Sequence, residues 1–202
     1  MLLTVGCPEF EYDGHPNRNA LTGRSATLIA ELRKGAVETL AAACDTRTTH
    51  ERLFQGLTPV GYEYYAGHYR GEDYTCLRDY EVRIPGDPLV GDPPNAVAFH
   101  LQQLSEIITT GLGALDSASQ DPRIPDHHKL YYVVAFMCRV FVEFLRIHPY
   151  ANGNGHAARF ISWAILGRYA YWPNAWPIEP RPSFSRVLNF HRTIPSWQAS
   201  TA

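Results

Sequence analysis

The residues best suited to chemistry lie close together, in the twelve-residue stretch from His148 to Arg159. Histidine has an ordinary pKa close to neutral pH, so His148 is a candidate general base. Gly153 and Gly155 have no side chains to cover their backbone N–H groups, and such groups at the start of a helix bind phosphate. Arg159 follows Gly155 by about one helical turn, so its guanidinium group could hold phosphate oxygens there. The stretch therefore predicts a phosphate-binding site beside a base.

Two apolar helix patterns flank this stretch and position it. Upstream, apolar residues recur at the three- and four-residue spacing of a helix face that runs into His148: Leu130, Val133, Val134, Met137, Val140, Phe141, Phe144 and Leu145. Pro149 ends that helix, because the residue before a proline avoids the helical conformation. The spacing resumes from about Gly155, at Ala157, Ile161, Ala164 and Ile165. We predict two helices joined by a functional loop; the alternative is a helix-turn-helix whose glycines only permit a tight turn.

The same residues resemble the signature of the Fic domain family, which reads His-Pro-Phe-x-Asp/Glu-Gly-Asn-Gly-Arg-x-x-Arg. With the aromatic Tyr150 in place of Phe, the chain matches at His148, Pro149, Gly153, Asn154, Gly155 and Arg159. The resemblance implies an all-α Fic-type domain with one β-hairpin, called the flap. It also implies transfer of a nucleoside monophosphate, usually AMP from ATP with Mg²⁺, to a Ser, Thr or Tyr hydroxyl of a target protein.

The resemblance also assigns roles to the matching residues. His148 would deprotonate the hydroxyl, and the backbone from Gly153 to Gly155 would hold the donor phosphates. Asn154 would add a side-chain donor, and Arg159 would hold the terminal phosphate. A P-loop nucleotidase is excluded, because Gly153 to His156 lacks the Lys-Ser/Thr ending that such a loop needs.

Two positions depart from the signature. Asn152 stands where the family has the acidic residue that binds Mg²⁺, and an uncharged amide oxygen is a weak ligand for that ion. His156 stands where the family has an arginine that neutralises phosphate, so the histidine would contribute a single donor to phosphate binding. Three alternatives remain open: a catalytically weak module that binds a nucleotide or a protein, a different nucleotide donor, and a phosphotransferase.

Length and composition predict one soluble domain. The chain has 202 residues, is 45% apolar and carries a formal charge of −2, which disfavours nucleic acid and anionic membranes as partners. No secretory signal and no apolar run of about 20 residues is found. The four cysteines (Cys7, Cys44, Cys76 and Cys138) are scattered, without metal-ligand spacing or a dense disulfide framework. A reducing cytoplasm is the expected location, although an effector translocated by another route would have the same features.

The expected single domain has five segments: an N-terminal arm (1–24), N-terminal helices (25–60), the flap region (61–90), the helices around the signature (95–170) and a C-terminal segment (171–202). In the arm, the residues from His15 to Arg18 could reach the site, but a surface loop is the favoured interpretation. A helix is predicted from Ser25, with Leu28, Leu32, Ala36, Leu40 and Ala43 on its buried face.

Thr27 and Glu31 lie on one face of that predicted helix, four residues apart. They resemble the Ser/Thr-x-x-x-Glu start of the inhibitory helix of Fic proteins, whose Glu contacts the last arginine of the signature. The resemblance implies inhibition within the chain or by a separate antitoxin-like partner. The alternative is an ordinary solvated glutamate.

A β-hairpin is predicted over residues 62–84, because tyrosines favour extended chain and Tyr80 to Ile84 alternates apolar with polar residues. Gly67 to Arg70 resembles the usual start of the flap. By the resemblance, Tyr80, Glu81, Val82 and Arg83 would dock the target protein by strand addition. The alternative is a hairpin that only covers the core.

Further helices are predicted from the remaining patterns. Thr48 and Glu51 resemble a capping box for a short helix that continues to Gln55. Another helix should run from Asn95 to the glycines at 111–113, followed by a polar loop over 116–126. The prolines after Tyr171 exclude a helix, and a last one should start at Ser183.

Overall fold

The computed structural model describes residues 6–82 and 90–173. Within these ranges the prediction of an all-α class is confirmed, because they hold six α-helices, one short 3-10 helix and no strand. The helices are α1 (Ala20–Arg33), α2 (Thr39–Cys44), α3 (Arg47–Phe54), η1 (Glu63–Tyr65), α4 (Pro94–Gln120), α5 (Asp126–Ile147) and α6 (Asn154–Arg168).

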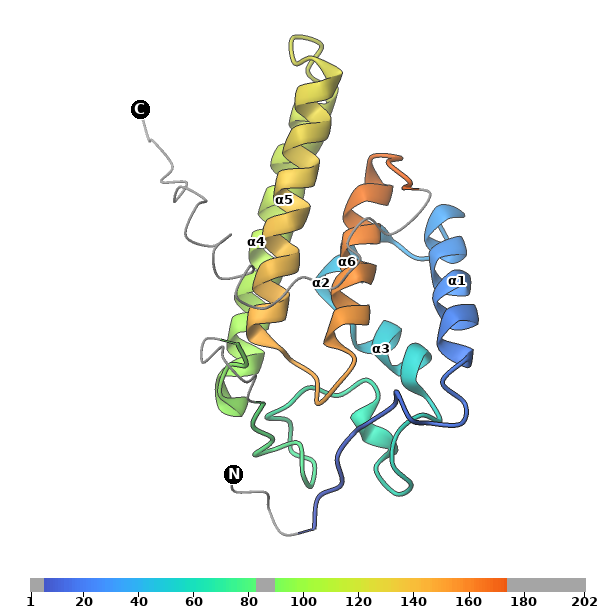
Figure 1. Ribbon diagram of the computed structural model, residues 1–202. Coiled ribbons are helices and arrows are strands. Elements are labelled where there is room, and N and C mark those ends of the chain that lie inside the picture. Colours follow the sequence, from blue (N-terminus) through green and yellow to red (C-terminus); the bar gives the residue numbers. More distant parts are fainter. Residues whose placement is uncertain (1–5, 83–89, 174–202) are drawn as a thin grey trace.

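Helix α6 lies at the centre of the fold, with α5 on one side and α1 on the other, and with α2 beside it (Figure 1). Apolar side chains are buried over most of its circumference, among them Ala157, Phe160, Ile161, Ala164 and Ile165. His156, Arg159 and Trp163 form the remaining, half-buried stripe. Gly153 is the N-cap residue of α6 and Gly155 lies in its first turn, so packing of this helix in the core fixes the predicted site directly.

Helices α4 and α5 form a long antiparallel hairpin whose tip extends beyond the other helices (Figure 1). The prediction that the first of them ends at Gly111 to Gly113 is wrong, because α4 continues to Gln120. Gly111 serves close packing instead: a Cβ atom there would lie 2.2 Å from the Phe136 ring of α5. Glycine inside a helix costs about 1 kcal/mol, and here it lets two helices approach closely.

The predicted helix from Ser25 to Ala43 is two helices in the structure. Helix α1 begins at Ala20, five residues before Ser25, and ends at Arg33. Gly35 has a φ of 69°, a conformation that few other residues adopt. Glu38 then caps α2, because its carboxylate accepts hydrogen bonds from the N–H groups of Leu40 and Ala41.

The capping box expected at Thr48 and Glu51 is not formed. Helix α3 begins at Arg47, after an N-cap residue, Thr46, whose side chain makes no capping hydrogen bond. The Thr46 hydroxyl is instead bonded to the Tyr150 hydroxyl, at 2.8 Å. A contact across the fold has replaced the expected local one.

The predicted β-hairpin is not found in the described part of residues 62–84. Glu63–Tyr65 is a 3-10 helix, turns follow it, and Tyr80 to Val82 form no strand; Arg83 and Ile84 lie outside the described residues. The tyrosines contact one another as an aromatic cluster, with ring centroids 5.0 to 5.9 Å apart: Tyr62, Tyr64, Tyr65 and Tyr74. Side-chain packing has overridden their preference for strands.

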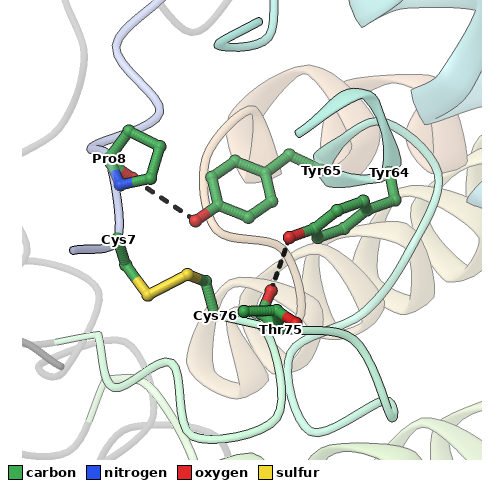
Figure 2. Close-up of a disulfide and its surroundings, with 6 residues drawn as sticks. All are labelled: Cys7, Pro8, Tyr64, Tyr65, Thr75 and Cys76. Carbon is green, nitrogen blue, oxygen red and sulfur yellow. Dashed lines mark hydrogen bonds between the residues drawn. A yellow bond between two sulfur atoms is a disulfide. The ribbon is translucent and has the colours of Figure 1, made fainter. Parts of the chain in front are cut away.

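A disulfide bond between Cys7 and Cys76 ties the N-terminal arm to this aromatic region (Figure 2). Next to it the Tyr65 hydroxyl donates to the carbonyl oxygen of Pro8, at 3.3 Å, and the Tyr64 hydroxyl donates to that of Thr75, at 2.6 Å. The pairing of two of the scattered cysteines removes the reason for expecting a reducing cytoplasm.

In the described ranges, no helix has both the length and the apolar character needed to cross a membrane. The helix predicted from Ser183 lies outside the described residues. Trp172, at the end of the described chain, stacks on Trp163 of α6 with the ring centroids 6.2 Å apart. The guanidinium group of Arg33 lies over the same Trp172 ring, so this aromatic residue links α1 to α6.

We predict that the Cys7–Cys76 bond forms in the purified protein. Alkylation of the denatured, unreduced protein should then label two cysteines, Cys44 and Cys138, and labelling after reduction should give four; intact mass measures both. Closing so long a loop should add about 2 to 4 kcal/mol to the free energy of unfolding. Reduction should remove this stability from the wild type but not from a Cys7→Ser/Cys76→Ser variant. Four labels without reduction would contradict the pairing.

Candidate functional site

The predicted base, His148, lies where α5 ends. Its backbone has a φ of 53° and a ψ of 60°, the left-handed conformation, and its N–H donates to the carbonyl oxygen of Phe144. Its Nδ1 atom lies 3.3 Å from the carbonyl oxygen of Leu145, to which an Nδ1–H group donates. In that tautomer Nε2 carries the lone pair, so it would be the atom that accepts a proton.

Arg70 holds this end of α5 in place. Its side chain is 1% exposed, and its guanidinium group donates to four backbone carbonyl oxygens at 2.8 to 3.1 Å: those of His148, Tyr80, Asp92 and Ile147. Its backbone N–H also donates to the carbonyl oxygen of Pro149. Burial lowers the pKa of Arg70 to about 10, so it remains charged at neutral pH. One buried cation thus joins the end of α5 to the segments around Tyr80 and Asp92.

Asn154 closes the loop between α5 and α6. Its side-chain oxygen accepts from the N–H of Tyr150, at 2.8 Å, and its side-chain nitrogen donates to the carbonyl oxygen of the same residue, at 2.9 Å. The Asn154 side chain is buried in this role. The predicted role of this side chain as a phosphate donor is therefore not supported by its contacts.

His50 of α3 supports the loop through two contacts, a role that no sequence pattern indicates. Its ring stacks on that of Tyr150, 3.7 Å away and nearly parallel. Nδ1 accepts from the N–H of Gly67, at 3.0 Å, so Nε2 must carry the proton that is donated to the carbonyl oxygen of Asn152, at 2.9 Å. Complete burial lowers the pKa of His50 to about 3, which keeps the ring neutral.

The two glycines of the stretch have different roles. A Cβ atom on Gly153 would lie 2.4 Å from the Phe54 ring and 2.8 Å from Nε2 of His50, and its φ is 79°. Gly153 is therefore required by packing and by its backbone conformation. A Cβ atom on Gly155 would meet nothing within 4 Å. Gly155 thus borders open space at the start of α6.

The backbone N–H groups of Asn154 and Gly155 are the candidate anion-binding groups of the loop. The next two N–H groups, of His156 and Ala157, both donate to the carbonyl oxygen of Gly153. Within residues 6–82 and 90–173, the N–H groups of Asn154 and Gly155 have no hydrogen-bond acceptor. Unpaired amides at the positive end of a helix attract negative charge, as a phosphate group would supply.

His156 is neutral in the folded protein. Burial, followed by the positive charge of Arg159, lowers its pKa to about 4. Its ring lies edge-on to those of Tyr12 and Phe54, at 5.9 and 5.7 Å. At neutral pH the first two turns of α6 therefore carry one formal positive charge, on Arg159, and that side chain is partly buried.

Asn152 holds the N-terminal arm. Its side-chain nitrogen donates to the carbonyl oxygen of Phe10, at 2.6 Å, while its side-chain oxygen accepts from the N–H of Gly153, at 2.8 Å. Among the described residues, no three His, Cys, Asp or Glu side chains gather where they could hold a metal ion. With the amide already bonded at both ends and without a carboxylate, this position does not fit a resident Mg²⁺ ion.

The predicted inhibitory residues are bonded to other partners, whereas the docking residue Tyr80 lies beside the end of α5, because its carbonyl oxygen and that of His148 accept from the same Arg70 guanidinium group. Both carboxylate oxygens of Glu31 accept from Arg52 of α3, at 2.7 and 2.8 Å, and the Thr27 hydroxyl donates to the carbonyl oxygen of Gly23. Glu31 is thus paired with Arg52, not with Arg159 as an inhibitory helix would require. Of the docking residues, Tyr80 contacts the Tyr65 ring and Glu81 is exposed.

No protein-family model, curated protein or solved structure gives a significant match to this chain. The function must therefore be inferred from the site. The loop between α5 and α6 contains His148, and the start of α6 carries two amides without an acceptor among the described residues, with Arg159 one turn further on.

We predict that the charge of Arg70 is essential for the loop. Arg70→Met leaves four carbonyl oxygens without their donor, two of them in buried hydrogen bonds, and should lower the free energy of unfolding by about 3 kcal/mol or more. Arg70→Lys keeps the charge and should cost less. The control is Arg78→Met, in the same segment: Arg78 forms an exposed ion pair with Asp73 and should cost less than about 1 kcal/mol. Urea unfolding measures all three, and equal losses for Arg70→Met and Arg78→Met would contradict the prediction.

His50 should make the protein sensitive to mild acid. The unfolded chain protonates His50 near pH 6.5, whereas the folded protein keeps it neutral to about pH 3. The unfolded state therefore binds more protons between these values, and stability falls as the pH drops through this window, by at most about 1.4 kcal/mol per pH unit. His50→Gln should have a shallower fall between pH 6.5 and 5 than the wild type. A control variant at the exposed His127 should keep the wild-type slope, and the same slope in His50→Gln would refute the assignment.

Proposed function

We propose that the chain is a Fic-like nucleotidyl transferase that moves a nucleoside monophosphate, with AMP from ATP as the expected case, to a hydroxyl group of a target protein. The observation that carries the proposal is the pair of unpaired N–H groups of Asn154 and Gly155, at the start of α6 and a few residues from His148. The match of six signature residues supports it independently.

In the proposed reaction the target hydroxyl oxygen attacks the α-phosphorus of the nucleotide. A new P–O bond forms, the bond between the α-phosphorus and the bridging oxygen breaks, and diphosphate leaves. Nε2 of His148 takes the hydroxyl proton. The amides at the start of α6 hold phosphate oxygens, and Arg159 faces the charge on the leaving group. Such transfer depends mainly on positioning and on charge stabilisation, which these groups supply without rearranging.

A binding module without transfer is the second candidate, and Asn152 and His156 favour it. Asn152 is bonded on both sides and contributes no negative charge for a metal ion. His156 is uncharged at neutral pH where a cation would neutralise phosphate. Both departures weaken the groups that stabilise the transferred phosphate. The expected docking hairpin is not found in the described residues, and Glu31 is paired with Arg52. Neither feature therefore helps to choose between the two candidates.

Transfer and binding should be separated by labelling. The protein is incubated with a panel of α-labelled nucleoside triphosphates and lysate, with Mg²⁺ or Mn²⁺, beside His148→Ala. We expect covalent label on a target that is lost in His148→Ala, while the variant still binds the nucleotide. Binding without label in every condition would identify a module, and no binding would refute the site.

The control for the anion site is at Gly155, where a side chain has space. Gly155→Asp adds an acidic group near the start of a helix, which favours the fold but repels phosphate. It should keep or slightly raise the midpoint of thermal unfolding and lose nucleotide binding, whereas Gly155→Ala should keep much of both. Equal nucleotide affinities for the two variants would show that the anion does not bind there.

A further inference from the structure

The N-terminal arm forms one side of the proposed site. It is attached at its start by the Cys7–Cys76 bond, and further along by the bond from Asn152 to the carbonyl oxygen of Phe10. The Phe10 side chain is also buried in the core, with 3% of the residue exposed, so the second attachment point is held by packing as well. The arm therefore lies against the loop in a fixed position, where the sequence favoured a plain surface loop.

The segment that follows Phe10 brings charge to the start of α6. The Tyr12 ring contacts His156, and the next residue, Asp13, forms an ion pair with Arg18 at 3.0 Å. Through this ion pair Arg18 is a cation of the part of the arm whose Tyr12 ring contacts His156, in the first turn of α6.

The charge at the start of α6 is too small for a triphosphate on its own. The tail of a nucleoside triphosphate carries several negative charges, and phosphate sites gather cationic side chains and helix N-termini around them. Here α6 supplies two amides and Arg159, since His156 does not contribute a charge. A second cation must come from another segment.

We propose that Arg18 is this second cation, so that the polyphosphate of the nucleotide is held between Arg159 of α6 and Arg18 of the arm. The inference rests on the proposed function, since it concerns the same anion. Arg18 exchanges Asp13 for a phosphate oxygen when the nucleotide binds. Its side chain is 57% exposed, which leaves it room to make this exchange.

Asp13 has a definite role in this arrangement, because it competes with the phosphate for Arg18 and repels the incoming anion. Removal of its charge should therefore strengthen binding. A purely structural ion pair behaves differently: loss of either partner would disturb the arm, and both variants would bind more weakly. Variants at Arg18 and Asp13 thus distinguish phosphate binding by Arg18 from a structural role of the ion pair.

The test measures affinity with a fluorescent ATP analogue, in the wild type and in Arg18→Ala, Asp13→Asn and Arg159→Ala, with inorganic tripolyphosphate as competitor. Arg123→Ala is the matched control, because Arg123 forms a similar exposed ion pair with Asp121 at the far tip of the α4–α5 hairpin. We expect Arg18→Ala to weaken binding about tenfold and Asp13→Asn to tighten it, with tripolyphosphate affinity changing in parallel. Arg123→Ala should not change the affinity.

The outcomes separate this inference from the proposed function. If Arg159→Ala loses affinity while Arg18→Ala binds like the wild type, the inference fails and the proposed function stands. If neither variant changes the affinity, both fail. Weaker binding in Arg18→Ala without tighter binding in Asp13→Asn would assign the pair a structural role and would also overturn the inference.

Discussion

The loop between α5 and α6 depends on one buried cation. The guanidinium group of Arg70 donates to carbonyl oxygens on both sides of the point where α5 ends, so the chain can leave the helix there without unpaired polar groups. A lysine could not satisfy four acceptors with the same planar geometry. The position of His148, and of everything that it could deprotonate, follows from this residue. Because Arg70 comes from the region of turns and aromatic contacts before α4, that region supports the site directly.

A second group of contacts fixes the start of α6. Asn154 bonds twice to the backbone of Tyr150, and His50 lies under the Tyr150 ring while it holds the carbonyl oxygen of Asn152. These side chains are buried and their hydrogen bonds are satisfied, as a rigid polar network requires. These contacts hold the first turn of α6 in one position, and a fixed position of its N–H groups is the preorganisation that phosphate recognition needs.

Local patterns in the sequence predicted the helices around the loop but not the contacts that hold it. The spacing from Leu130 to Leu145 and the break at Pro149 predict α5. The predicted first residue of α6, Gly155, is within one residue of the observed start at Asn154. Gly111 was misread because a glycine that permits close packing against Phe136 is indistinguishable, in one sequence, from one that ends a helix. The roles of Arg70 and His50, and the pairing of Cys7 with Cys76, depend on residues far apart in the chain. No local spacing reveals such partners.

The left-handed backbone of His148 carries a cost that stability experiments can use. A residue with a Cβ atom in this conformation is less favourable than glycine by about 1 kcal/mol. Replacement of His148 by glycine should therefore yield a more heat-resistant protein that lacks the proposed base. An ordinary core or surface position would not gain stability from such a change, so thermal screening of variants could single out His148 as a residue retained at the expense of the fold.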